Sequence, residues 1–244
     1  MLAIIGGSGL TQLANLEVSH RQAVRTPYGE PSGALTFGAI RGMPVIFLAR
    51  HGYGHTLPPH QVNYRANLWA LKEQGAREVV SVVSVGGIRD DLGPGKIVIP
   101  HQIIDYTWGR MSSFFEGEAP VKHIDFTEPY AAGLRARLLA AAARCGEAAG
   151  DGAVYAATQG PRLETAAEID RLEKDGADVV GMTGMPEAAL AREIDLDYAA
   201  LALVVNHAAG RGASAGGVSL EGIEEVLKDA AGRACRIIEA FVAP

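Results

Sequence analysis

Short β-branched runs alternate along this chain with longer segments rich in alanine, leucine and glutamate. The alternation predicts an α/β fold in which helices cover a mainly parallel sheet. Several of the runs are apolar at consecutive positions, as expected when helices cover both faces of a sheet and neither face meets water. We therefore expect a buried central sheet flanked by helices.

The expected strands are the apolar runs 2–5, 34–40, 44–48, 79–85, 97–100, 153–157, 178–181 and 199–205. The expected helices are the segments 61–74, 129–145, 164–174, 186–195 and 219–241. Two of these helices carry end signals. Gly75 follows the first helix, and glycine accepts the left-handed backbone that ends many helices. Ser219 precedes Glu221 and is expected to cap the start of the last helix.

The size and charge of the chain limit its organisation and partners. It has 244 residues, and the even spread of apolar runs favours a single domain over residues 1–244. The formal net charge at pH 7 is −6, so the basic surface that a nucleic-acid backbone requires is missing. No apolar stretch approaches the roughly 20 residues that cross a bilayer, and the N-terminus carries no charged leader. We expect a cytoplasmic protein whose partners are neither nucleic acid nor membrane.

Three segments at the ends of predicted strands could bind an anion. Ser8 lies in a glycine turn whose free amide hydrogens can donate to an anion, although an ordinary tight turn explains it equally well. Arg50 and His51 follow a strand at the edge where open sheets bind ligands, and the arginine fork can make two bonds to a phosphate. Ser84 lies near the end of another predicted strand, just before Gly86 and Gly87, whose amide hydrogens could also donate to an anion. We expect the three segments to converge on one anion-binding pocket.

Metal binding has less support. His51, His55 and His60 lie close together in the sequence, but no HExxH or carboxylate–histidine pattern accompanies them. Cys145 and Cys235 fall in predicted helices, so we expect packing rather than a disulfide or a metal site.

Three further positions near strand ends could contact a ligand, and each has a structural explanation as well. Glu164 begins a predicted helix, where the helix dipole would stabilise its charge without any ligand. Met182 and Thr183 end a strand, and methionine usually fills gaps in a core. Asn206 ends an apolar strand, so its amide needs partners from the backbone or from a ligand.

Taken in order, these segments resemble the family of purine nucleoside phosphorylases and methylthioadenosine phosphorylases over nearly the whole chain. The most similar stretches are residues 4–10, 26–29, 48–56, 62–72, 86–98 and 182–193. The resemblance implies a Rossmann-like α/β phosphorylase with a mixed, mainly parallel sheet. It also implies that the protein cleaves a purine nucleoside with inorganic phosphate, needs no metal or organic cofactor, and forms a homotrimer or a dimer of trimers.

The family's phosphate site falls on five positions of this chain. These are Ser8, Arg50, His51, Ser84 and Thr183. Val83 stands where methylthioadenosine relatives usually have a threonine, and Ser84 stands where they usually have alanine. Met182 matches a methionine beneath the ribose, and Leu163 matches an aromatic residue that stacks on the base.

The base pocket that the resemblance implies differs from that of adenosine-type relatives, which carry aspartates at Asn206 and Ala208. Asn206 can donate to O6 or N7 of a purine. Glu164 stands where 6-oxopurine phosphorylases carry a glutamate, and its carboxylate can accept the N1–H that hypoxanthine has and adenine lacks. These two positions indicate a 6-oxopurine.

At the ribose end, phosphorylases of ordinary nucleosides place a histidine at the position of Leu220, with Val218 close by. An apolar wall there cannot satisfy a 5′-hydroxyl but can bury a methylthio group. His123 matches a residue that reaches the 5′ pocket of a neighbouring subunit in the family.

We therefore expect an enzyme that cleaves a 6-oxopurine nucleoside with a 5′-methylthio group, giving hypoxanthine and 5-methylthioribose 1-phosphate. Asn206 is the expected catalytic residue, because it can stabilise charge that grows on the leaving base. An amide is no general acid, so no residue is assigned to the N7 proton. Methylthioadenosine, inosine or guanosine could be the substrate instead. The sequence is also compatible with a nucleosidase indifferent to phosphate and with a non-catalytic purine-binding module.

Overall fold

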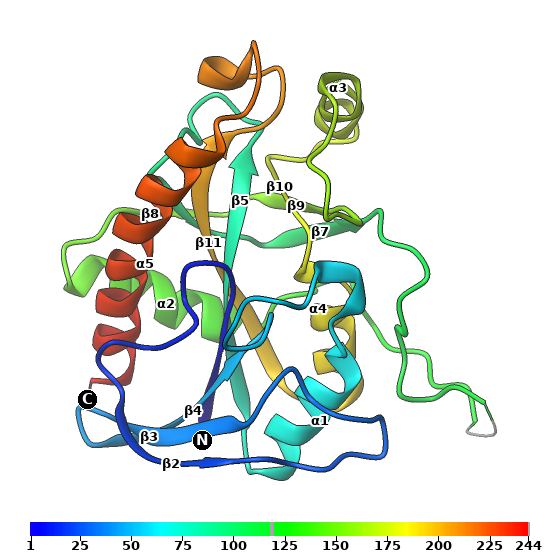
Figure 1. The fold of residues 1–244 in the computed structure, drawn as a ribbon, viewed down its shortest axis with the longest axis vertical. Coiled ribbons are helices and arrows are strands. Elements are labelled where there is room, and N and C mark those ends of the chain that lie inside the picture. Colours follow the sequence, from blue (N-terminus) through cyan, green and yellow to red (C-terminus); the bar gives the residue numbers. More distant parts are fainter. Residues whose placement is uncertain (118–119, 244) are drawn as a thin grey trace.

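The computed structural model describes residues 1–117 and 120–243 (Figure 1). Within these ranges eleven strands form one sheet. The strands are β1 (Leu2–Gly6), β2 (Glu17–Gln22), β3 (Leu35–Ile40), β4 (Met43–Ala49), β5 (Glu78–Gly87), β6 (Ile97–Ile99), β7 (Gln102–Asp105), β8 (Ala149–Asp151), β9 (Val154–Ala157), β10 (Val179–Gly181) and β11 (Asp197–His207). The helices are α1 (Tyr64–Glu73), α2 (Ala132–Arg144), α3 (Ala166–Lys174), α4 (Gly184–Glu193) and α5 (Leu220–Val242). Short 3-10 helices cover Pro59–Gln61 and Gly212–Ser214.

The sheet is mixed and mainly parallel, which confirms the expected fold class. Parallel pairing joins β1 to β4 and β5, β5 to β11, β6 to β8, and β9 to both β7 and β10. Antiparallel pairing joins β3 to β2 and β4, β10 to β5, and β11 to β6. In Figure 1 α2 and α5 lie on one side of the central strands, and α1 and α4 lie on the other.

The central strand β5 is buried on both faces. Val79 and Val83 belong to the core that includes residues of α1 and α4, whereas Val80 and Val82 belong to the core that includes residues of α2 and α5. Successive side chains of a strand point to opposite faces, so a strand covered on both faces must be apolar throughout. This arrangement explains the consecutive apolar positions in the sequence.

β5 changes its neighbour along one edge. β11 pairs with β5 over almost its whole length, so β1 and β10 share the opposite edge. On that edge β1 pairs with Glu78 to Ser81, and β10 pairs with Gly86 and Gly87. Between Ser81 and Gly86 no strand of the described residues pairs there, so a gap opens beside β5. The gap lies at the carboxyl ends of β1 and β4, where open α/β sheets bind ligands.

The expected helices are present, but several begin later than expected. The predicted starts at residues 61 and 164 are wrong because side chains cap the backbone further along. Asn63 accepts from the Ala66 amide and caps α1, and Thr165 forms a capping box with Glu168 at the start of α3. α2 begins at Ala132 rather than at residue 129.

The predicted end signals at Gly75 and Ser219 are confirmed. Gly75 adopts a φ of +86° just after the end of α1. Ser219 accepts from the Gly222 amide at the start of α5. Both thiols, Cys145 and Cys235, are free and partly buried.

Three strands have no counterpart among the expected elements. β2 is exposed at all six positions and polar at all of them except Val18, and it is held by antiparallel pairing with β3 at one end of the sheet. β7 and β8 are short and add to the sheet through pairing with β9 and β6. None of the three shows the buried apolar run that makes a strand visible in a sequence. No helix of the described residues is long and apolar enough to cross a membrane.

Candidate active site

A cavity of about 700 Å³ lies in the gap beside β5. Its walls come from the carboxyl ends of β1, β4, β5, β10 and β11 and from the first turns of α5. It is lined by all but one of the predicted site residues: Ser8, Arg50, His51, Ser84, Leu163, Glu164, Met182, Thr183, Asn206, Val218 and Leu220. The fold therefore brings together residues that lie far apart in the sequence.

The phosphate candidates enter the cavity from separate elements. Ser8 follows β1, Ser84 lies in β5, and Thr183 follows β10. Thr183 is 7% exposed and lines the cavity, and its hydroxyl makes no capping bond to α4. The Ser8 hydroxyl lies 3.5 Å from Nε2 of His55. Hydroxyls and backbone amides in such a concave arrangement suit a tetrahedral anion.

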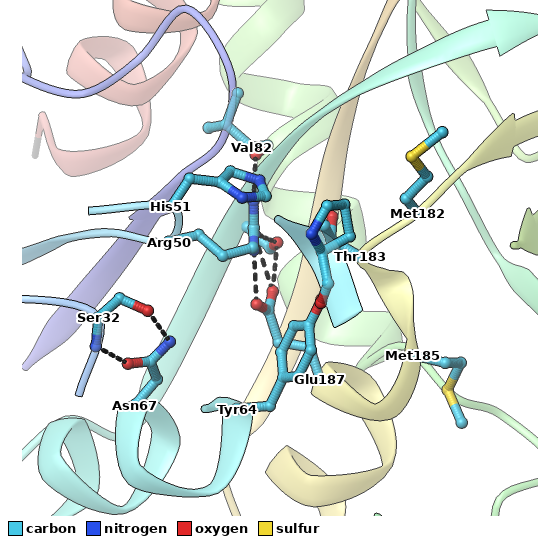
Figure 2. A network of polar contacts seen from close by, with 12 residues as sticks. Ser32, Arg50, His51, Tyr64, Asn67, Val82, Met182, Thr183, Met185 and Glu187 are labelled. Atoms are coloured by element: carbon cyan, nitrogen blue, oxygen red, sulfur yellow. Dashed lines mark hydrogen bonds and ion pairs between the residues drawn. The ribbon is translucent and has the colours of Figure 1, made fainter. Parts of the chain in front are cut away.

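Nε and Nη2 of Arg50 are already bonded within the protein, which corrects the expectation that this edge of the guanidinium would bind a phosphate through two hydrogen bonds. Nε donates to Glu187 Oε2 at 2.7 Å and Nη2 donates to Glu187 Oε1 at 2.9 Å (Figure 2). Nη1 donates to the Val82 carbonyl at 3.2 Å and lies beside Gly7, where a Cβ would come within 2.9 Å of it. Arg50 can therefore offer a cavity ligand Nη1 but not its bidentate edge.

Glu187 is the centre of a buried polar network behind the cavity. Its Oε1 also accepts from the Ser81 hydroxyl at 2.7 Å and from the Tyr198 hydroxyl at 2.8 Å. Burial alone would raise the pKa of the Glu187 carboxyl, but the Arg50 charge and these bonds hold it below its ordinary value. Burial alone would lower the pKa of Arg50, and Glu187 raises it above its ordinary value. The pair is therefore charged and internally neutralised.

His51 is buried beside this pair, and its tautomer follows from its neighbour. Nδ1 lies 2.8 Å from the Leu57 carbonyl, so Nδ1 carries the proton and donates to that oxygen. Burial and the nearby Arg50 charge lower the pKa of His51 to about 4. Near neutral pH His51 is therefore uncharged, and its Nε2 can accept a hydrogen bond from a cavity ligand.

Glu164 is oriented by a residue that the sequence did not indicate. The Thr158 hydroxyl donates to Glu164 Oε1 at 2.5 Å and lies at the end of β9. This bond leaves Oε2 of Glu164 free to accept from a ligand. Leu163, the adjacent predicted base contact, lines the cavity and is 39% exposed.

Asn206 reaches the cavity because β11 is irregular at that point. The register of β11 against β5 shifts between Val204 and Asn206, and such a bulge re-aims side chains. Val205 and Asn206 then both line the cavity. One amide hydrogen of Asn206 donates to the His207 carbonyl at 2.6 Å, which leaves the second hydrogen and the amide oxygen for a ligand.

One wall of the cavity is apolar and comes largely from α5. Val218 and Leu220 line it as expected, and Ile223 and Leu227 continue it one helical turn further each. Leu227 packs on Gly9, which has a φ of +75° and where a Cβ would lie 2.5 Å from the leucine side chain. Leu220 is 71% exposed, so this wall stands at the mouth of the cavity.

His123 is the predicted site residue that lies outside the cavity of its own chain. It is exposed and belongs to the long connection between β7 and α2. Its expected contact with a neighbouring subunit stays a prediction.

Several residues of the site were missed by sequence reasoning. Glu187 belongs to a segment that contains two predicted contacts, but only the fold turns its carboxylate towards Arg50. Thr158 had no local signal. Ile223 and Leu227 follow Leu220 at helical spacing, which is a signal that could have found them. Among the described residues, no group of three or more His, Cys, Asp or Glu side chains is arranged to hold a metal ion.

An open α/β sheet with a cavity of about 700 Å³ at its strand ends, lined by anion donors, is the arrangement expected of a nucleoside phosphorylase. The model of the phosphorylase superfamily matches residues 1–243. The chain belongs to this superfamily, so the expected family and enzyme class are confirmed.

Similar proteins carry the names of more than one phosphorylase activity. A probable S-methyl-5′-thioinosine phosphorylase of Pseudomonas syringae is 56% identical over 232 residues, which are 95% of this chain and 94% of that protein. The 6-oxopurine nucleoside phosphorylase of Pyrococcus furiosus is 46% identical over 215 residues, or 86% and 80% of the two chains.

Solved structures of methylthioadenosine phosphorylases share the fold. One from an antarctic soil metagenomic library is 40% identical with a TM-score of 0.92, covering 99% of this chain and 84% of that chain. The enzyme of Schistosoma mansoni in complex with adenine is 30% identical with a TM-score of 0.94, covering 99% and 90%.

Proposed function

We propose that this protein cleaves S-methyl-5′-thioinosine with inorganic phosphate, giving hypoxanthine and 5-methylthioribose 1-phosphate. One observation carries the proposal: a single cavity joins polar groups suited to a keto purine with an apolar wall suited to a thioether. The similarity to the Pseudomonas syringae protein, whose name describes this activity, supports it.

The polar groups favour hypoxanthine over adenine. Hypoxanthine has a carbonyl acceptor at O6 and a donor at N1, whereas adenine has an amino donor at C6 and an acceptor at N1. The amide hydrogen of Asn206 that His207 does not use can donate to O6 or N7. The carboxylate of Glu164, held by Thr158, can accept from N1. Adenine in the same place would set its N1 acceptor against the Glu164 carboxylate with no hydrogen between them, and such an unpaired contact costs about 1–3 kcal/mol.

The α5 wall favours a methylthio group over a hydroxyl. Ile223 and Leu227 present apolar surface to the cavity beside Val218 and Leu220. Burying a thioether against such surface is favourable by about 25 cal/mol per Å² of apolar area. A 5′-hydroxyl in contact with these side chains would lose its hydrogen bonds to water without replacing them.

Hydrogen phosphate completes the reaction without an external acid. The hydroxyls of Ser8, Ser84 and Thr183 can donate to its oxygens, and Nε2 of His51 can accept from its hydroxyl. A phosphate oxygen bonds to C1′ as the bond from C1′ to N9 of the purine breaks. The proton of hydrogen phosphate ends on the purine, so charge and atoms balance. Asn206 stabilises the negative charge that grows on the purine before it gains this proton.

The same proposal extends to cofactors and assembly. Phosphate serves as co-substrate, and the reaction uses no metal or organic cofactor. The protein works in the cytoplasm as a homotrimer or a dimer of trimers. His123 of one copy would then approach the 5′ end of the next copy's cavity. The exposure of His123 and of Leu220 in the single chain supports this arrangement.

The decisive experiment compares three nucleosides with and without phosphate. Methylthioinosine, methylthioadenosine and inosine are incubated with the protein, and the free base and the sugar product are quantified. We expect phosphate-dependent cleavage of methylthioinosine that is faster than cleavage of the other two. Preference for methylthioadenosine would overturn the base assignment, and equal use of inosine would overturn the 5′ assignment. Cleavage without phosphate, with release of free methylthioribose, would identify a hydrolase.

A further inference from the structure

Arg110 lies outside the cavity but bonds two segments that line it. Nη1 donates to the backbone carbonyls of Met182 at 2.8 Å and Met185 at 2.6 Å. Nη2 donates to the backbone carbonyls of Thr158 at 3.3 Å and Gln159 at 2.9 Å. One planar group therefore bridges residues 158–164, here named the base loop, and residues 182–185, here named the ribose loop.

Both loops carry the groups that would contact the nucleoside. The base loop holds Leu163 and Glu164, and its Thr158 orients the Glu164 carboxylate. The ribose loop holds Met182 and Thr183. The separation of the two loops sets the distance between the base contacts and the sugar contacts, so a group that bonds both backbones controls the shape of the nucleoside site.

Arg110 is itself held firmly in this position. Nε donates to the Gln159 side chain at 3.2 Å, and Nη1 also donates to the Tyr64 hydroxyl at 3.2 Å. Its guanidinium lies over the Tyr64 ring, 5.6 Å from the centroid. All of its acceptors among the described residues are neutral, unlike the carboxylate that binds Arg50. Its contacts are thus directed at backbone carbonyls rather than at an opposite charge.

We propose that Arg110 is a positioning residue that holds the base loop and the ribose loop at the separation the nucleoside requires. The guanidinium suits this role because its donors spread over a rigid plane and can reach two backbones at once. A lysine ammonium is a single point and cannot bridge both loops in the same way. The inference rests on the proposed function for the identity of the nucleoside, but not for the bridge itself.

The test compares Arg110→Ala with a matched control, Arg65→Ala. Arg65 bonds the same connection between β7 and α2, through the Ser113 carbonyl and the Glu116 carboxylate, but contacts neither loop. In Arg110→Ala we expect KM for the nucleoside to rise about tenfold, because small misplacements of binding groups are costly. KM for phosphate should rise by a smaller factor, because Ser8 and Ser84 lie on other elements. Arg65→Ala should leave both values near those of the wild type.

Chemical rescue separates positioning from a general loss of structure. Guanidinium ion at millimolar concentration should restore a measurable part of the activity of Arg110→Ala and none in Arg65→Ala. Arg110→Lys should remain impaired even if its melting temperature equals that of the wild type. Equal rises of KM in the two alanine variants, or a failure of guanidinium to restore activity, would overturn the proposal.

A second readout needs no turnover. Amide hydrogen exchange of the ligand-free protein should become faster in both loops together in Arg110→Ala, and in neither loop in Arg65→Ala. Unchanged exchange in Arg110→Ala overturns the bridge whatever the substrate is. The KM comparison of the two alanine variants uses whichever of the three nucleosides the wild type cleaves fastest. An error in the proposed substrate therefore does not affect the outcome of that comparison.

Discussion

At the scale of single residues, the buried pair of Arg50 and Glu187 decides how an anion is bound. The two charges neutralise each other behind the cavity, at 1% side-chain exposure each. A phosphate therefore meets hydroxyls, amides and one guanidinium nitrogen rather than a free buried cation. Losing Glu187 would leave the Arg50 charge unpaired, and an unpaired buried charge is strongly destabilising.

The first prediction at this scale concerns base recognition by Asn206. In Asn206→Asp a carboxylate replaces the amide donor, so the preference should shift from methylthioinosine towards methylthioadenosine. We expect the ratio of their kcat/KM values to change by roughly tenfold to a hundredfold, the equivalent of about one unpaired buried group. Competition of the two nucleosides in one reaction measures this ratio directly.

Asn206→Ala is the matched control for this prediction. It removes the donor without adding an acceptor, so cleavage of both nucleosides should slow without any reversal of preference. An unchanged ratio in Asn206→Asp would mean that this residue does not read the base.

The second prediction at this scale concerns His51 and pH. Its folded pKa of about 4 lies below the 6.5 of an exposed histidine, so below pH 6.5 the unfolded chain binds the proton more readily. The free energy of unfolding should therefore fall as the pH is lowered from 6.5 to 4, by up to about 3 kcal/mol from this residue. Urea unfolding of the wild type and of His51→Asn over this range measures the effect.

The asparagine variant removes the titration while keeping a polar side chain at the site. Its unfolding free energy should therefore depend on pH less steeply than that of the wild type. Parallel curves for the two proteins would show that His51 does not titrate with a lowered pKa.

At the scale of elements, the first turns of α5 act as the wall of the 5′ pocket. Ile223 and Leu227 lie on the cavity side of the helix, at helical spacing from Leu220. The Ser219 cap fixes where this helix begins, and Gly9 allows Leu227 to pack against the turn after β1. The position of the wall therefore depends on a helix cap and on one close backbone contact.

The prediction at this scale is that Ile223→Ser weakens selection for the methylthio group. A smaller polar side chain removes apolar contact, so the preference for methylthioinosine over inosine should fall by about tenfold. Steady-state kinetics with the two nucleosides provides the ratio. Glu224→Ser, on the exposed side of the same helix, should leave it unchanged. A similar loss of preference in both variants would indicate damage to α5 rather than loss of a contact.

At the scale of the whole molecule, the cavity exists because two strands share one edge of β5 without filling it. β1 and β10 each pair with one end of that edge, and the unpaired stretch between them becomes the floor of the site. The mouth remains open in the single chain, with Leu220 largely exposed and His123 outside. The proposed assembly of several copies would cover this mouth and complete the 5′ end.

The sequence by itself determined the fold class, the main strands and helices, and most of the residues around the cavity. Buried strands must be apolar throughout, and residues at the ends of parallel strands must meet at one edge of the sheet. Ser8, Arg50 and Asn206 were visible for this reason, because β1 runs parallel to β4 and β5, and β5 runs parallel to β11. Edge strands such as β2 were not visible, because backbone pairing rather than an apolar face holds them.

Only the tertiary structure decided how these groups are used. The ion pair of Arg50 with Glu187, the bond of Thr158 to Glu164 and the bridge by Arg110 each join residues whose partners no local pattern specifies. Hydrogen bonds depend on distances and angles of a few tenths of an ångström and on what burial leaves unsatisfied. Spacing along a chain carries no such information, so the orientation of the site emerges only when the strands and loops have packed.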